Sequence, residues 1–303
     1  MLKPRILVPV NFAPGCEETL SQAGLLAQQA GAILSCLHVM ETKNVLSRAL
    51  ALGDQNKKQR REAEVALASF VHKVFDGIDS IPFELIVSEG DFVETVVQKV
   101  EELDVLFLVV SGKSTPDHPS CIRKSDHFRL LAQARVPVLS LGELRLTKLQ
   151  HVLVPVDMGK GLRRQLSALI DLAGSFELSL TLCSVIRPSS IRYEEACRKR
   201  LTAITVHLRN LNFSCRTKLL VTHRDVASEV LGRTDQFDTD LLLVQTSTSG
   251  DRSKIGQVTR DILQKSPMPV MTVGPLCHVD AQFNLPGVGR IFEPVKDTFP
   301  NEQ

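Results

Sequence analysis

The sequence predicts two tandem α/β domains, each a doubly wound, five-stranded parallel sheet with helices on both faces. Residues 6–10 read Ile-Leu-Val-Pro-Val, and residues 152–156 read Val-Leu-Val-Pro-Val. A second echo follows at 137–139 and 269–271, where Pro-Val-Leu is matched by Pro-Val-Met. Between these landmarks, short apolar runs alternate with segments of helical periodicity. A chain of 303 residues can hold two such copies, each large enough to bury a core.

The first copy opens with a continuous apolar run at 5–10, which is typical of a strand buried on both faces. Apolar side chains at helical spacing follow at 17–31, with Gly31 suited to end that helix. Further strands are expected at 32–39, 83–88, 105–110 and 136–141, and further helices at 57–75, 92–102 and 123–134.

The second copy repeats this order. Strands are expected near 151–156, 178–185, 216–221, 240–245 and 269–273, and helices near 161–174, 192–211, 225–236 and 255–266. The apolar run at 106–110 is matched with 241–245. Domains are therefore expected at 1–146 and 147–276, joined too closely for a flexible tether, and residues 277–303 form a Pro- and Gly-rich tail.

Composition narrows the function classes. A hydrophobic fraction of 43%, a charged fraction of 23% and a net charge of +2 favour a globular protein that binds neither nucleic acid nor membranes. The basic runs at 57–61 and 198–200 lie beside glutamates and are typical of solvated helix faces. Seven cysteines without paired or metal-ligand spacing predict free, mostly buried thiols, a cytoplasmic location and no metal centre.

Several short features recur in both copies. The opening strand ends at Asn11 or Asp157, and the second strand ends in His38-Val39 or Ser184-Val185. Glu89-Gly90-Asp91 leads into a helix of the first copy, an aspartate precedes the fourth strand in each copy, and Pro-Val opens each last strand. In this order, and present twice, these features resemble the universal stress protein family, as a tandem two-domain member.

The resemblance implies an architecture and a ligand. Strand order 3-2-1-4-5 is implied for each copy, with the last strands pairing inside one chain as an intramolecular pseudo-dimer, and a further homodimer is allowed. Many family members bind ATP or a related nucleotide through a Gly-x2-Gly-x9-Gly-Ser/Thr loop. Such glycines let backbone N–H groups close on phosphate oxygens at a helix N-terminus.

The second copy matches that loop in part. Gly256 stands at the third glycine position, Gln257 replaces the hydroxyl residue, and Gln245 and Thr248 occupy the first two glycine positions. Gly250 is the other glycine of the loop. With the acid at the end of the first strand, the site implied by the resemblance is Asp157, Val185, Gly250, Gly256 and Gln257.

The first copy departs further from the family pattern. Asn11 replaces the acid and Lys124 replaces the third glycine, although Ser125 keeps the hydroxyl position. We therefore expect the first copy to have a structural role.

Three functions remain open from the sequence. The leading hypothesis is a regulatory stress-response protein, not an enzyme, with a weak site for ATP or AMP in the second copy and an unidentified protein partner. The second is a protein-interaction module that needs no nucleotide. The third is a slow ATPase, disfavoured because no general base is visible.

Overall fold

The computed structural model describes residues 3–41, 53–76, 81–112, 122–158, 162–189, 191–246 and 255–279. In the first half the elements are β1 (Arg5–Pro9), α1 (Pro14–Ala30), β2 (Ile33–Glu41), α3 (Gly53–Val74), β3 (Phe83–Gly90), α4 (Phe92–Glu102), β4 (Val105–Ser111), α5 (Lys124–Gln133) and β5 (Val138–Leu141). In the second half they are β6 (His151–Pro155), α6 (Arg163–Ala173), β7 (Ser179–Ile186), α7 (Ile191–Asn210), β8 (Ser214–Val221), α8 (Val226–Leu231), the 3-10 turn η1 (Asp235–Phe237), β9 (Leu241–Gln245), α9 (Gln257–Lys265) and β10 (Val270–Val273).

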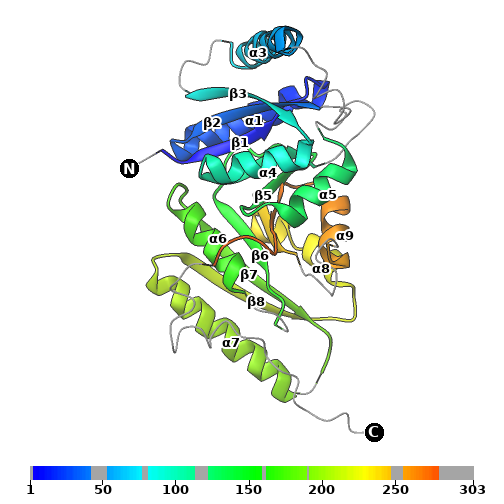
Figure 1. Cartoon of the computed structure of the whole chain (residues 1–303). Coiled ribbons are helices and arrows are strands. Elements are labelled where there is room, and N and C mark those ends of the chain that lie inside the picture. The colour runs from blue at the N-terminus through cyan, green and yellow to red at the C-terminus, as the bar shows by residue number, and fades with distance from the viewer. Residues whose placement is uncertain are drawn as a thin grey trace.

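Both halves contribute to one sheet of ten strands, in the order β3-β2-β1-β4-β5-β10-β9-β6-β7-β8 (Figure 1). Each half therefore has the order 3-2-1-4-5, and its neighbouring strands run parallel. The predicted α/β fold class is confirmed, because every predicted strand has a counterpart in this sheet.

The last strands of the two copies pair directly. Strands β5 and β10 run antiparallel, with Leu139 opposite Met271, which are equivalent positions of the repeat. A residue that faces its own equivalent lies on a two-fold axis. The helices obey the same relation, because the Arg260 guanidinium carbon lies 5.5 Å from the ring centre of its equivalent, Phe128. The two copies are therefore related by a pseudo-two-fold axis within one chain.

The link between β5 and β6 packs on α1. The Leu146 and Leu149 backbone N–H groups donate to the Gln22 and Gln29 side-chain oxygens at 2.9 and 3.0 Å, and Gln29 Nε2 donates to the Leu149 carbonyl at 3.0 Å. These hydrogen bonds satisfy backbone N–H and C=O groups of the link and hold it against α1.

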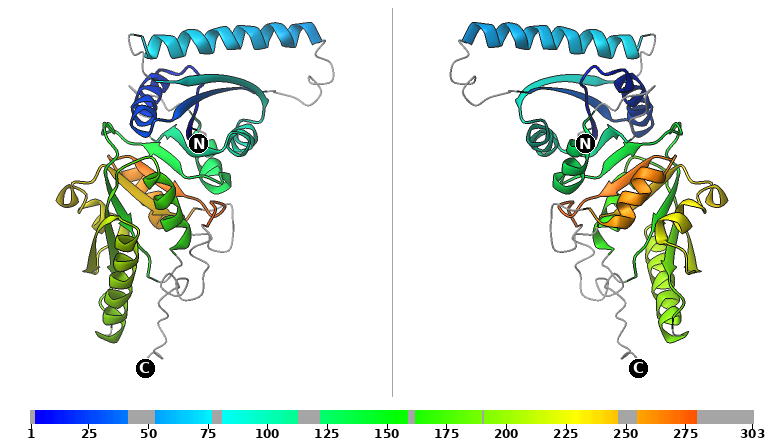
Figure 2. Two further views of the ribbon diagram at one scale, coloured as in Figure 1. Left: turned by 90° about the vertical axis from the view of Figure 1, so that its left-hand side faces the viewer. Right: turned by 90° about the vertical axis from the view of Figure 1, so that its right-hand side faces the viewer.

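Hydrophobic cores cover both faces of the sheet, and each core contains residues of both copies. Helices α1, α3, α6 and α7 pack on one face, while α4, α5, α8 and α9 pack on the other. Figures 1 and 2 show the long helices α3 and α7 at opposite ends of the molecule. None of the described helices combines the length and apolar character that a membrane span requires.

Two sequence expectations were wrong in detail. The helix expected at 225–236 ends at Leu231, and the chain then forms η1, because Phe237 turns into the core at 8% exposure beneath the Arg216 guanidinium. A glycine follows Leu231 and weakens any longer helix.

The second correction concerns the repeat itself. Arg5 pairs with Val105 but Ile6 pairs with Phe107, so Leu106 is the extra residue of a β-bulge. Since Val152 pairs with Leu241, the equivalent of Leu241 is Phe107, one residue beyond the match made from the sequence. The first-copy equivalent of Thr246 is therefore Gly112. The Gly112 N–H donates to the Leu141 carbonyl, just as the Thr246 N–H donates to the Val273 carbonyl.

Candidate functional site

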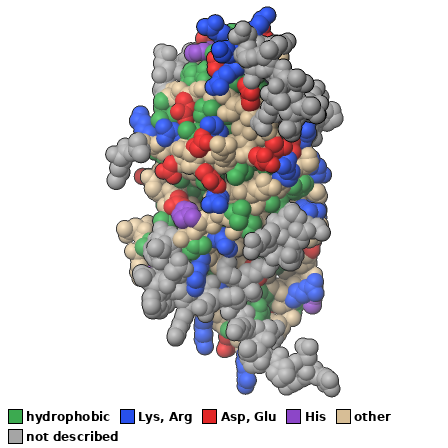
Figure 3. All heavy atoms as spheres, viewed as in Figure 1, with side chains coloured by type: hydrophobic (Ala, Val, Ile, Leu, Met, Phe, Trp, Pro, Cys, Tyr) green, Lys and Arg blue, Asp and Glu red, His purple; other side chains and the backbone are tan. Residues whose placement is uncertain are grey.

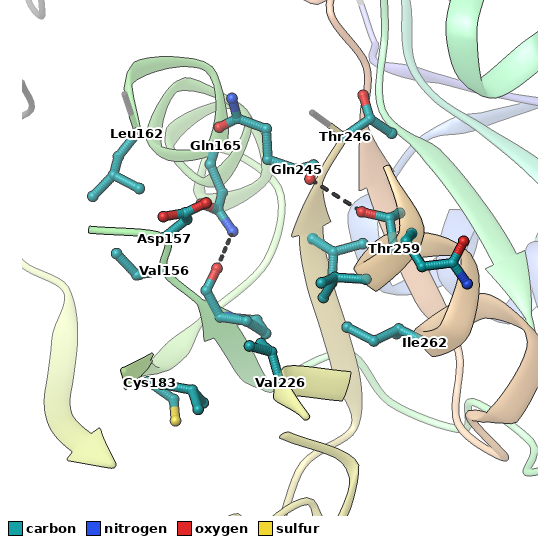
Figure 4. Close-up of a pocket in the computed structure, with 15 residues that line it drawn as sticks. Val156, Asp157, Leu162, Gln165, Cys183, Val226, Gln245, Thr246, Thr259 and Ile262 are labelled. Atoms are coloured by element: carbon teal, nitrogen blue, oxygen red, sulfur yellow. Dashed lines mark hydrogen bonds between the residues drawn. The ribbon is translucent and has the colours of Figure 1, made fainter. Parts of the chain in front are cut away.

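A pocket of about 280 Å³ lies at the carboxyl ends of β6, β7 and β9, in the second copy (Figure 4). Strand β6 pairs with β7 on one side and with β9 on the other, so this is the switch point of the half-sheet. Doubly wound folds bind ligands at this position. The apolar lining residues are Pro155, Val156, Leu162, Cys183, Val185, Val226, Val244, Val258 and Ile262. The polar lining residues are Asp157, Gln165, Gln245, Thr246, Gln257 and Thr259.

Gln165 closes the sheet beneath the pocket. Pairing between β6 and β9 ends at Leu153 and Leu242, which leaves the next carbonyls without strand partners. Gln165 Nε2 donates to the Pro155 and Leu243 carbonyls at 3.0 and 2.9 Å, and the residue is only 1% exposed. A buried amide that satisfies two carbonyls in this way fixes the separation of the two strand ends.

Helix α9 presents its first turn to the pocket. Gly256 is its N-cap and supplies no side-chain cap, while Gln257 and Thr259 line the wall. The Gln257 amide donates to the Asp261 carboxylate at 2.9 Å, and Thr259 Oγ1 donates to the Gln245 carbonyl at 3.3 Å. Backbone N–H groups at such a helix start carry partial positive charge.

The charge of the lining is limited to one side chain. Asp157 lies just after β6 and is exposed to solvent. Cys183 is buried on β7, where it pairs with Pro155, and burial raises the pKa of its thiol to about 11, so the thiol is protonated at neutral pH. Within the described ranges, no group of three or more His, Cys, Asp or Glu side chains is placed to hold a metal ion.

The structure brings together most of the residues expected from the sequence. Asp157, Val185 and Gln257 line one pocket, and Gly256 adjoins Gln257 at the helix cap. Gly250 lies outside the described residues.

Sequence reasoning missed Gln165 and Thr259. The helical apolar pattern places Gln165 beside the buried Leu166 and Leu169. A glutamine buried at such a position indicates that its side-chain amide forms hydrogen bonds inside the protein. Nothing in the sequence indicates that its partners are strand-end carbonyls.

The equivalent first-copy residues are engaged locally. The Asn11 side-chain oxygen, at the position of Asp157, accepts from the Ala13 N–H and from Cys16 Sγ, both at 3.1 Å. His127 takes the place of Thr259, and its Nε2 lies 2.7 Å from Ser140 Oγ. Burial lowers the pKa of His127 to about 4, which keeps its ring neutral.

Comparisons with known proteins agree with this fold. The model of the universal stress protein family matches residues 4–139, which is most of the first copy. No curated protein sequence matches the chain.

Solved structures cover both copies. A universal stress protein from Archaeoglobus fulgidus shares 15% identity at a TM-score of 0.63, covering 92% of this chain and 97% of its own. A protein of unknown function from Pseudomonas aeruginosa shares 17% identity at a TM-score of 0.55, covering 90% and 93%. Another A. fulgidus universal stress protein, in complex with dAMP, covers 41% of this chain and 97% of its own, at 16% identity and a TM-score of 0.32.

Proposed function

We propose that the chain is a member of the universal stress protein family, whose model matches residues 4–139. We further propose that it is a regulatory stress-response protein whose second copy binds an adenine nucleotide, ATP or AMP. We assign the first copy a structural role, in which it completes the sheet. A reducing cytoplasm suits the six described cysteines, which are all buried and form no disulfide with one another.

The pocket beside Asp157 is the observation that carries this proposal. Its volume of about 280 Å³ is close to the lower end of small-molecule sites, and its walls are mostly aliphatic, as a purine ring requires. A carboxylate at its rim can accept hydrogen bonds from ribose hydroxyls. The Gln257 amide, which would obstruct the pocket if it turned inward, is held by Asp261 instead.

Binding without turnover is the action we favour. The ionisable groups of the described lining are the Asp157 carboxyl and the Cys183 thiol, and the thiol stays protonated. Hydrolysis of a phosphoanhydride needs a positioned base and stabilisation of the developing charge, and neither group supplies both. We therefore propose that ligand occupancy is read by a protein partner.

The test begins with the purified full chain. Denaturation followed by mass spectrometry identifies any adenine nucleotide that was bound, and calorimetric titration with AMP and ATP measures affinity. We expect binding, and an Asp157→Ala variant should weaken it by about tenfold or more, because a hydrogen-bonded charge is lost. Asn11→Ala, at the equivalent first-copy position, is the matched control and should bind as the parent does.

Other outcomes would replace the proposal. If no nucleotide is released and titration gives no heat, the chain is a nucleotide-independent interaction module. If ADP forms from ATP, and formation stops in Asp157→Ala but continues in Asn11→Ala, the protein is a slow ATPase.

A further inference from the structure

A second cavity of about 310 Å³ adjoins the ligand pocket. It lies between the end of β7, the segment that leads into α8, and helix α9. Val185, Val226, Gln257 and Val258 line both spaces, so the two cavities lie side by side. A ligand seated beside Asp157 can therefore extend past Val185 into the second cavity.

Two arginines line this cavity. Arg187 follows β7, and in the part of the chain that the structure describes it has no ion pair or side-chain hydrogen bond. Arg224 lies 4.0 Å from the Glu229 carboxylate, but Arg233 binds that carboxylate more closely, at 2.8 Å. Both arginines can thus bind an added anion without losing a strong existing partner.

The carboxylates of the same cavity already have partners. The Asp225 carboxylate accepts from the Ser228 N–H at 2.9 Å as the N-cap of α8, and hydrogen bonds from the Ser228 side chain and backbone lower its pKa. Asp261 accepts from the Gln257 amide. Among the described residues, neither carboxylate forms an ion pair with Arg187 or Arg224, so both guanidinium groups keep donors for an added anion, although the four charges of the lining sum to zero.

At two equivalent positions the first copy carries the opposite charge. Glu41 stands where the second copy has Arg187, and Arg129 stands where it has Asp261. Arg123, the equivalent of Ile255, pairs with Glu41 at 2.9 Å, and Arg129 bridges Asp91 and Asp126 at 3.3 and 3.5 Å. Figure 3 shows acidic side chains gathered over the first copy on the face that carries α4. The first-copy cleft therefore has a net acidic lining whose arginines are paired, whereas the second-copy cavity balances two arginines against two aspartates and does not pair them with each other.

The ligand pocket itself does not favour a phosphate next to Asp157, because that carboxylate is the one charged side chain of its described lining. From the adjoining cavities and the two arginines that form no close ion pair, we propose that Arg187 and Arg224 bind the phosphate of the adenine ligand. This assignment rests on the proposed function. It places the phosphate on the side of Val185 away from Asp157, with arginine replacing the glycine loop as its main support.

The experiment compares adenosine, AMP and inorganic phosphate by calorimetric titration at low salt. On the parent chain we expect AMP to bind about tenfold more tightly than adenosine, since two partly solvated arginines each add a modest attraction. Arg187→Gln combined with Arg224→Gln should remove this preference and leave adenosine binding unchanged. The control is Arg198→Gln combined with Lys199→Gln. These substitutions also remove two positive charges, but from exposed positions of α7 that line neither cavity.

Each result separates the two proposals. If neither adenosine nor AMP binds the parent chain, the adenine site is wrong and this assignment falls with it. If AMP binds but keeps its preference in the cleft double variant, the phosphate lies elsewhere, for example at the start of α9, and only this assignment is overturned. If inorganic phosphate binds as tightly as AMP, the arginines hold a free ion and not a ligand phosphate.

Discussion

The carboxyl edges of the two half-sheets are built from equivalent elements but carry different side chains. In the first copy, Asn11 bonds its own loop, His127 bonds Ser140, and arginines bridge the carboxylates of the cleft. In the second copy, Asp157 stands at the rim of a mostly apolar pocket and Arg187 has no described partner. The comparison teaches that a duplicated backbone can keep its packing while its two edges acquire separate chemistry.

The match to the family model and the candidate ligand pocket are found in different copies. The family model matches residues 4–139, yet the candidate ligand pocket lies in the second copy. Buried strands and helical periodicity are spread over a whole domain, whereas a ligand site depends on a few side chains. Resemblance to a family therefore locates the fold better than it locates the working site.

The largest effect is expected where the copies meet. Gly142 and Gly274 are equivalent, but a Cβ at Gly142 would lie 2.3 Å from the Pro267 carbonyl oxygen, whereas one at Gly274 would lie 2.8 Å from the Leu131 oxygen. Gly142→Ala should lower the free energy of unfolding by about 3 kcal/mol, and Gly274→Ala by about 1–2 kcal/mol. Urea unfolding measures both.

Gly174→Ala is the control for these two variants. An added Cβ there would lie 3.2 Å from the Asp171 carbonyl oxygen, on an ordinary helical backbone. Equal stability of Gly142→Ala and the parent chain would show that the contact between the copies is looser than the structure indicates.

The second largest effect is a pH dependence of stability that His127 causes and that its equivalent, Thr259, cannot cause. The folded pKa of about 4 lies below the ordinary value near 6.5, so the unfolded chain takes up the proton first as the pH falls. Stability should therefore drop between pH 6.5 and 4, by about 2 kcal/mol from pH 8 to pH 5. His127→Thr should lose this contribution.

Chemical unfolding of both proteins across this pH range makes the measurement. Other carboxyls titrate in each protein, so the informative quantity is the difference between the two pH profiles. Parallel profiles would mean that the folded chain admits the proton at His127.

The smallest effect concerns the ion pairs of the first-copy cleft. Arg129→Gln removes pairs with Asp91 and Asp126, and should lower the free energy of unfolding by about 0.5 kcal/mol at low salt. Asp261→Asn, at the equivalent second-copy position, should change stability less, because its described partner is a neutral amide.

Thermal unfolding at low and high salt tests this pair. The Arg129→Gln effect should shrink as salt screens the ion pairs. A larger loss in Asp261→Asn would show that the second-copy cleft depends on this carboxylate for its stability.

The sequence predicted the elements because their signals are local. These signals depend only on neighbours in the chain. They are the apolar runs such as 6–10 and 152–156, the helical periodicity and the Pro-Val pairs that open the last strands, and they predicted the strands of both half-sheets. The same signals could not reveal the bulge at Leu106. A bulge depends on how a strand pairs with a distant partner.

The candidate site shows the same division. Asp157, Val185, Gly256 and Gln257 follow from motif positions at strand and helix ends, which the order of elements brings to one edge. Gln165 escaped notice because its partners, the Pro155 and Leu243 carbonyls, become available only where β6 and β9 separate.

By itself, the sequence determined that this protein is a duplicated α/β fold with its candidate ligand residues at one edge of the second copy. The tertiary structure alone decided the β5–β10 pairing register, the position of the pocket beside the Arg187 cavity, and the different charge balance of the two edges. The physical reason is that periodicity records which way each side chain faces, whereas hydrogen bonds and ion pairs depend on distances between residues far apart in the chain.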